Sequence, residues 1–460
     1  MTMDILLVLM TYLLVLTLAG ALLYFTGRRE RVVTPIVLFV GIEVLAVWPA
    51  LVPLEDGLLA TVGAFPAVLA AVGLLAAVVI YVVFGGGRAD ASIWRNSKRS
   101  IPDAETLRSV RVGLVLLVIL LVGLGLFTFQ GLPPLLTGGF SSLLDPVNNA
   151  DQATVIRETR KSLTKGQLLG QEYSGNGIIN AFTETGWRVA VAVAVLHWTW
   201  SRKARSIRLL AVTSLLAFIF LGSAGSRTPL LLCIIAGGAA LALRYRLKMR
   251  HLAVATALGL GFVLLIMPLS KGATGGTTLT ERSAAFVERV SSGNGANNAQ
   301  IVRLITSGSL DVMNGELFVE RFVAMVPGNS PANPFALRVT RLAYGGNDKT
   351  TGYSTPTQYG LTYADGGSIG VILGYLFSGA LLALAWRAIT RVRHPLGAAA
   401  ATEGAILLGS VSVSGIHGLL SAAPLAALLL LVVSGPRGWS GLAARRRGSA
   451  TKPKAFADDR

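Results

Sequence analysis

The sequence predicts an all-α, polytopic integral membrane protein with about 11 transmembrane helices and two large extracytoplasmic loops. Of its 460 residues, 53% are hydrophobic and only 14% are charged, whereas a soluble domain carries about 25% charged residues. The apolar residues gather in runs of the length that a bilayer-spanning helix needs, roughly 20 residues. Short basic clusters separate many of these runs. A soluble regulator is therefore excluded.

The apolar runs define the expected spans. We expect residues 1–434 to form one membrane domain and residues 435–460 to form a flexible, basic cytoplasmic tail. The first run has no basic region before it, which indicates a retained helix instead of a cleaved signal. The predicted spans cover about residues 4–26, 33–52, 62–84, 112–130, 178–200, 208–222, 228–243, 252–269, 366–388, 396–414 and 418–434.

The basic residues predict the orientation of these spans. The chain has 41 Lys and Arg against 23 Asp and Glu, a net charge of +18, which by itself could indicate a nucleic-acid-binding protein. The positive charges fall instead in every second connection between apolar runs, and positive charge in short connections marks the cytoplasmic side. We therefore expect the cytoplasmic membrane, an external N-terminus, a cytoplasmic C-terminus and no nucleic-acid partner.

Two of the remaining connections are long, at residues 131–177 and 270–365. Long loops inside compact proteins are usually functional or disordered. Apolar segments in the second loop, near residues 286–290, 301–305 and 317–325, have the pattern of short amphipathic helices. We therefore expect these loops to form two ordered caps on the outer face.

Both long loops contain several basic residues. Guanidinium groups remain charged and bind phosphate through paired hydrogen bonds, so these residues favour a shared anion site. A solvated face or contact with lipid headgroups is the structural alternative. The residues concerned are Arg157, Arg160, Lys161, Lys165, Arg282, Arg289, Arg303, Arg321, Arg338 and Arg341.

A tight turn at residues 223–229 places Arg227 at the outer membrane interface. A cation there is costly unless it reaches water or meets an anion. Pro229 suits the first turn of a helix, where free backbone N–H groups favour phosphate. The pattern predicts an anion-binding arginine, with a snorkelling arginine as the alternative.

Other ionisable residues have both structural and catalytic interpretations. Glu184 and Arg188, four residues apart, would share a helix face and neutralise one another. His417 is the histidine predicted near the outer side and could act as a general base or be structural. With one cysteine, Cys233, and no zinc, phosphate-loop or Asp-x-Asp motif in the long loops, the sequence predicts neither a metal nor a nucleotide cofactor.

Three stretches form an ordered pattern over roughly residues 170–390. A Gly-Ser-Arg-Thr-Pro turn at 225–229 opens a predicted span, and Phe322 to Pro327 precedes Pro331 and Pro334 late in an outer loop. The third stretch contains Pro356, Gly360, Tyr363, Asp365, Gly366, Gly367 and Gly370. Together they resemble the O-antigen polymerase and oligosaccharide repeat-unit polymerase family of bacterial envelopes. The chain departs from many relatives in having Leu361 in place of an acidic residue and Gly366 in place of Phe.

The resemblance implies a membrane glycosyltransferase that moves a growing glycan from a polyprenyl pyrophosphate carrier to another lipid-linked repeat unit. Membrane lipids, a chain-length regulator and a flippase are the other expected partners. Arginines would stabilise the leaving pyrophosphate in a role that a metal often fills elsewhere. The expected ligands are Arg227, Arg321, Arg338, Arg341 and Arg160, the expected base is His417, Asp365 or Glu172, and the expected sugar-stacking residues are Tyr363 and Tyr173.

Three other functions remain open on the sequence. A ligase that transfers the glycan to a different acceptor would use similar residues. A transporter or flippase of lipid-linked sugars would also need many helices and a cationic cavity, although transporters commonly contain repeats and broken midplane helices. A non-catalytic envelope scaffold would use its arginines as headgroup contacts.

Overall fold

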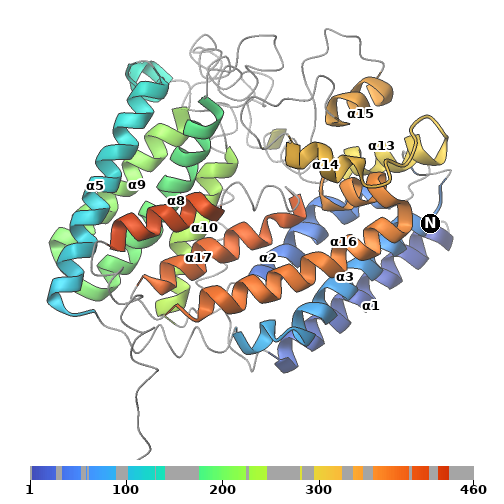
Figure 1. The fold of residues 1–460 in the computed structure, drawn as a ribbon, viewed down its shortest axis with the longest axis horizontal. Coiled ribbons are helices and arrows are strands. Elements are labelled where there is room, and N and C mark those ends of the chain that lie inside the picture. Colours follow the sequence, from blue (N-terminus) through green and yellow to red (C-terminus); the bar gives the residue numbers. More distant parts are fainter. Residues whose placement is uncertain are drawn as a thin grey trace, which may run out of the picture.

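The structure is a computed structural model of the chain, and its described residues form helices, turns and connections. No β-strand occurs among them (Figure 1), which confirms the all-α class for this part of the chain. The described residues are 3–26, 34–52, 59, 62–89, 102–129, 131–139, 176–223, 227–245, 280–281, 295–323, 335–344, 356–392, 396–413 and 423–434.

Within this part, five helices are long and apolar enough to cross a membrane. By length and composition these helices fit the predicted membrane protein. The five are α1 (Met3–Thr26), α3 (Phe65–Val83), α5 (Ala104–Thr128), α9 (Ala204–Ser223) and α16 (Gln358–Thr390).

Further predicted spans correspond to helices outside this group of five. One is α8 (Asn176–Ser201), and a shorter apolar helix occupies Ala423–Ser434. The predicted span at 252–269 lies outside the described residues. Three more predicted spans correspond to α2 (Pro35–Ile42), α10 (Arg227–Arg244) and α17 (Gly397–Gly409). Helix α2 continues as a π-helix (Glu43–Val47) and a 3-10 helix (Trp48–Leu51).

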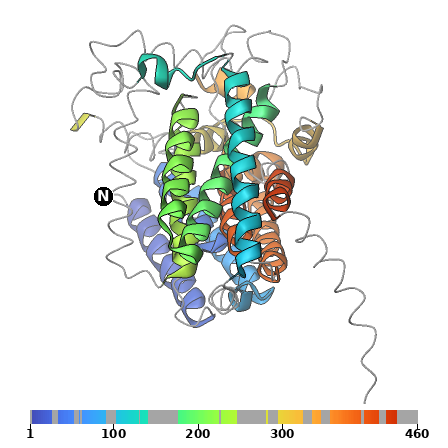
Figure 2. The ribbon, with the colours of Figure 1, turned by 90° about the vertical axis from the view of Figure 1, so that its left-hand side faces the viewer.

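The long helices form two groups with separate hydrophobic cores. One core is built from α1, α2, α3 and α16, and the other from α5, α8, α9 and α10. Figure 2 shows the second group in the foreground, viewed from the side that faces away from the first group. Helix α17 lies between the groups (Figure 1): Ala401 and Ala405 belong to the first core, and Ala399 and Ile406 to the second.

Basic connections lie at one end of the two groups, which we call the basic end. There the guanidinium of Arg387, late in α16, donates to the carbonyl of Phe84 after α3 (3.0 Å). Arg202, between α8 and α9, donates to the hydroxyl of Tyr245 after α10 (3.4 Å). Figure 1 shows these helix ends on the lower side of the molecule. Most residues of the predicted basic connections lie outside the described residues, so their alternation stays a prediction.

Helix α16 starts with a sharp reversal that the sequence analysis did not predict. Gly366 (φ −151°, ψ 19°) and Gly367 (φ 57°, ψ −144°) leave the helical conformation, and the second pair of angles is essentially restricted to glycine. The amide of Gln358 donates to the hydroxyl of Ser378 (3.3 Å), although 20 residues of continuous helix would separate them by about 30 Å. Residues 358–365 therefore fold back along the following helix.

This helical hairpin is closely packed. A Cβ atom at Gly370 would collide with the carbonyl oxygen of Thr362, and one at Gly374 with the side chain of Thr362. The predicted span at 366–388 coincides with the part of α16 that follows the reversal. Gly370, which was singled out from the sequence, thus has a packing role here.

Two short helices pack on this hairpin, α13 (Gly295–Thr306) and α14 (Glu316–Val323), and a third, α15 (Phe335–Tyr344), packs on α13. We call these three helices the cap. Figure 1 shows the cap on the upper side, opposite the basic end. The helices predicted near 301–305 and 317–325 are confirmed, whereas α15 was not predicted and the segment 286–290 lies outside the described residues. The cap core contains Ile301, Leu304, Leu317, Phe335 and Val339 together with Leu361 and Ala364 of the hairpin.

Candidate functional site

Helix α15 brings two of the predicted phosphate ligands together. Arg338 and Arg341 are three residues apart, the spacing that places side chains on the same side of a helix, and both are half-buried. Phe335 and Val339 on the same helix pack into the cap core. The apolar residues of α15 therefore anchor the helix that carries the two cations.

Arg338 has contacts that leave its positive charge without a counter-ion. One terminal nitrogen lies 3.1 Å from the sulfur of Met313, and the guanidinium carbon lies 5.8 Å from the centre of the Phe335 ring. Its Nε is buried without a hydrogen-bond partner. Thioether sulfur is a weak acceptor, and no carboxylate pairs with Arg338 within the described part of the chain. Chemically, this group can accept an anion.

Asp365 lies at the reversal of α16, where its carboxylate meets the start of α14. Its Oδ1 accepts hydrogen bonds from the backbone N–H groups of Gly315 (2.9 Å) and Leu317 (3.1 Å). The backbone N–H of Met313 donates to the carbonyl of Ala364 (2.8 Å). A carboxylate is favourable at a helix N-terminus, where backbone N–H groups lack intrahelical partners.

Tyr363 is half-buried in the folded-back segment of α16. Its ring stacks on Tyr359, with 6.1 Å between ring centres and an angle of 18°. The hydroxyl of Tyr359 donates to the carbonyl of Pro66 at the start of α3 (3.1 Å). Tyr363 also packs against the cap core, and its predicted contact with a sugar stays a prediction.

Arg227 is the first residue of α10, with Pro229 in the first turn, as the sequence predicted. The preceding helix, α9, ends at Ser223, whose hydroxyl accepts from the backbone N–H of Leu135 (3.0 Å). Since α9 begins beside Arg202 at the basic end, Arg227 lies at the opposite end of the bundle. The structure does not describe the side chains of two predicted ligands, Arg227 and Arg321. Four other predicted site residues lie wholly outside the described residues: Arg160, Glu172, Tyr173 and His417.

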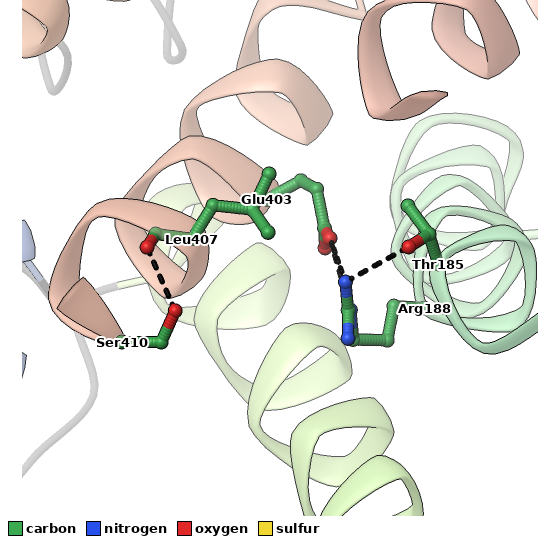
Figure 3. Close-up of polar contacts among 5 residues, drawn as sticks. All are labelled: Thr185, Arg188, Glu403, Leu407 and Ser410. Atoms are coloured by element: carbon green, nitrogen blue, oxygen red, sulfur yellow. Dashed lines mark hydrogen bonds and ion pairs between the residues drawn. The ribbon is translucent and has the colours of Figure 1, made fainter. Parts of the chain in front are cut away.

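A buried ion pair joins the two helix groups below the cap. Figure 3 shows the guanidinium of Arg188 on α8 donating to Oε1 of Glu403 on α17 (2.9 Å) and to the hydroxyl of Thr185 (3.2 Å). Arg188 is 6% exposed and Glu403 1% exposed. The sequence analysis predicted Glu184 as the partner of Arg188. That prediction missed Glu403, which is 215 residues away in the chain and which only the tertiary fold brings near.

A second buried carboxylate lies in the first helix group. Glu43 is fully buried and accepts hydrogen bonds from the hydroxyls of Tyr375 (2.7 Å) and Ser412 (2.6 Å). It begins the π-helical turn after α2, and such turns are frequent at functional sites. An acidic residue inside the predicted span at 33–52 was the signal for this site, and the sequence analysis did not use it.

We compared the chain with models of known protein families, with characterised proteins and with solved structures. Nothing matches it.

Two arrangements have chemical potential. The cap offers a cationic guanidinium at one end of the long apolar helices, which suits an anionic ligand. The Arg188–Glu403 pair and the Glu43 cluster are polar groups inside the membrane domain, where ionisable residues are rare and commonly functional. Within the described residues, no group of three or more His, Cys, Asp or Glu side chains could hold a metal ion.

Proposed function

We propose that the protein is a membrane glycosyltransferase that polymerises polyprenyl-pyrophosphate-linked oligosaccharide repeat units on the outer face of the cytoplasmic membrane. The observation that carries this proposal is Arg338, a half-buried cation without a carboxylate partner in the described residues, on a helix fixed at the end opposite the basic connections. Basic connections mark the cytoplasmic side, so the cap faces outward. A lipid-linked diphosphate presents its charge at that interface.

The reaction transfers the glycan between two lipid carriers. A hydroxyl of the acceptor sugar attacks the anomeric carbon of the donor glycan, and the bond from that carbon to the pyrophosphate oxygen breaks. The hydroxyl proton passes to a base, for which the sequence offers His417, Asp365 and Glu172. The carrier leaves as polyprenyl pyrophosphate with the bonding electron pair, through an oxocarbenium-like transition state.

The arginines stabilise the charge that develops on the leaving pyrophosphate. Fixed cations aimed at a developing charge lower the barrier without reorganisation during the reaction. Tyr363 supplies an aromatic face for a sugar ring, with Tyr173 as a second candidate. The proposed pyrophosphate ligands are Arg227, Arg321, Arg338, Arg341 and Arg160.

Transport of a lipid-linked sugar is the second candidate function. The ion pair between Arg188 and Glu403 joins two helix groups, and the helix of α16 is broken at Gly366 and Gly367. Both features are common in transporters. The break in α16, however, lies beneath the cap, and Asp365 beside it is bonded to α14, which favours a structural role for the break.

A reconstituted reaction separates these functions. The full-length protein, purified in detergent, is incubated with polyprenyl-pyrophosphate-linked repeat units extracted from membranes of the source cells. We expect longer lipid-linked chains, and we expect one molecule of free polyprenyl pyrophosphate for each glycosidic bond formed. Glycan appearing only on a different added acceptor would instead indicate a ligase. Movement of the lipid across proteoliposomes without new glycosidic bonds would replace the proposal with the transporter.

A further inference from the structure

The helix that carries Arg338 and Arg341 packs into the cap core, and two carboxylates in succession add polar connections between it and the membrane domain. We propose that Asp365 and Glu320 are positioning residues, which hold α15 in place over the end of α16, and that neither is the proton acceptor of the reaction. This inference rests on the proposed glycosyltransferase function for its consequence in catalysis. The connection itself is a property of the fold.

Asp365 makes the first connection, from the reversal of α16 to α14. Residues 314 and 315 have positive φ angles (48° and 93°), and this turn directs the N–H groups of Gly315 and Leu317 toward the Asp365 carboxylate at 2.9 and 3.1 Å. The carbonyl of Asp365 also accepts from Gly315 (3.2 Å). One residue thus satisfies backbone donors that α14 cannot pair internally.

Glu320 makes the second connection, from α14 to α15. Its Oε1 accepts a hydrogen bond from the backbone N–H of Phe335 (3.1 Å), the first residue of α15. Arg338, one turn further along α15, reaches back to the sulfur of Met313 at 3.1 Å. Met313 is itself bonded to the carbonyl of Ala364 beside Asp365. These contacts connect α16 to α14 and α14 to α15, and they connect α15 to α16 again through Met313.

The same contacts argue against Asp365 as a general base. A base takes up a proton, and protonation would remove the negative charge that makes the two backbone hydrogen bonds strong. It would also remove the favourable interaction between the carboxylate and the N-terminal end of α14. Proton transfer to Asp365 would therefore weaken, without breaking, the hydrogen bonds that hold the helices that place the arginines. The structure assigns Asp365 to holding the cap.

Paired substitutions at Asp365 and Glu320 distinguish a role in positioning α15 from a role in proton transfer. Asp365→Asn and Glu320→Gln keep the accepting oxygen but lose basicity, whereas Asp365→Ala and Glu320→Ala lose both. We expect the amide variants to keep at least a third of the wild-type kcat/KM for chain lengthening. We expect the alanine variants to lose at least tenfold, mainly through a higher KM for the lipid-linked repeat unit. Asp311→Ala, which removes an exposed carboxylate from the same cap, is the matched control.

Hydrogen exchange of residues 313–320 in the full-length protein supplies a readout independent of activity. Asp365→Ala should speed exchange of the Gly315 and Leu317 amides at least tenfold, and Asp365→Asn should preserve their protection. Loss of activity in Asp365→Asn equal to that in Asp365→Ala, with amide protection intact, would overturn the proposal and make Asp365 the base. Unchanged exchange in Asp365→Ala would also overturn it. If the wild-type protein builds no chains, the proposed function fails, while the exchange result still decides whether the connection exists.

Discussion

Replacement of Glu403 by Leu is expected to destabilise the protein by about 3–5 kcal/mol, because it leaves the Arg188 guanidinium buried without its counter-charge. Arg188 is 6% exposed, so the cation cannot readily reach water. The hydroxyl of Thr185 can satisfy one N–H group but not the charge. Thermal unfolding of the detergent-solubilised protein, followed by the loss of the monodisperse peak in size-exclusion chromatography, measures the effect.

A double substitution tests whether the charge is the cause. The double variant Arg188→Met, Glu403→Leu replaces both charged side chains with apolar side chains of similar length. Proteins whose buried ion pairs are replaced in this way often keep their stability. We expect this double variant to unfold within a few degrees of the wild type. The interpretation would be wrong if Glu403→Leu alone unfolded at the wild-type temperature, or if the double variant were as unstable as the single one.

Substitution of Arg227 by Ala is expected to lower chain lengthening about 100-fold or more without lowering the amount of folded protein. Removing one preorganised group that stabilises developing negative charge typically costs 10²–10³-fold in rate. The first turn of α10 also presents backbone N–H groups at this position. The rate of formation of longer lipid-linked chains by the purified protein measures the effect, with chromatographic recovery as the measure of folding.

The matched control for Arg227 lies at the other end of the bundle. Arg202→Ala removes an exposed arginine that bonds to Tyr245, so it changes the net charge by the same amount away from the proposed site. We expect this variant to lengthen chains at the wild-type rate. Normal lengthening by Arg227→Ala would remove Arg227 from the mechanism, and an equal loss in both variants would indicate a general effect of charge.

The sequence predicted the helices best where a single helix face or an apolar run determines them. The start of α10 followed from Pro229, and α14 followed from the apolar pattern at 317–325. The reversal of α16 was not predicted, because glycines at 366 and 367 permit a turn but are also tolerated within apolar helices. Helix α15 was missed because the expected Pro- and Asn-containing linker at 327–334 ends directly before it.

The sequence identified candidate residues by their chemical type and not by which of them lie together. The three-residue spacing of Arg338 and Arg341 places them together on α15. Contacts between distant residues were not accessible from spacing: Asp365 meets Gly315, and Arg188 meets Glu403, only because separate helices pack together. The chemical character of these residues was readable from the sequence, but their partners depend on the tertiary fold.

The proposed reaction requires a cap that faces outward, and cysteine labelling on intact cells tests this orientation most directly. The chain has one cysteine, Cys233, which is buried, so a Cys233→Ala background leaves no native thiol. One of two cysteines is then introduced into this background. Ser309→Cys lies at an exposed position beside the cap helices, and Lys203→Cys at an exposed position of the basic end. A membrane-impermeant maleimide should label the Ser309→Cys protein in intact cells and the Lys203→Cys protein only after permeabilisation. The reverse pattern would place the arginine-bearing cap in the cytoplasm and contradict the proposed reaction at the outer face.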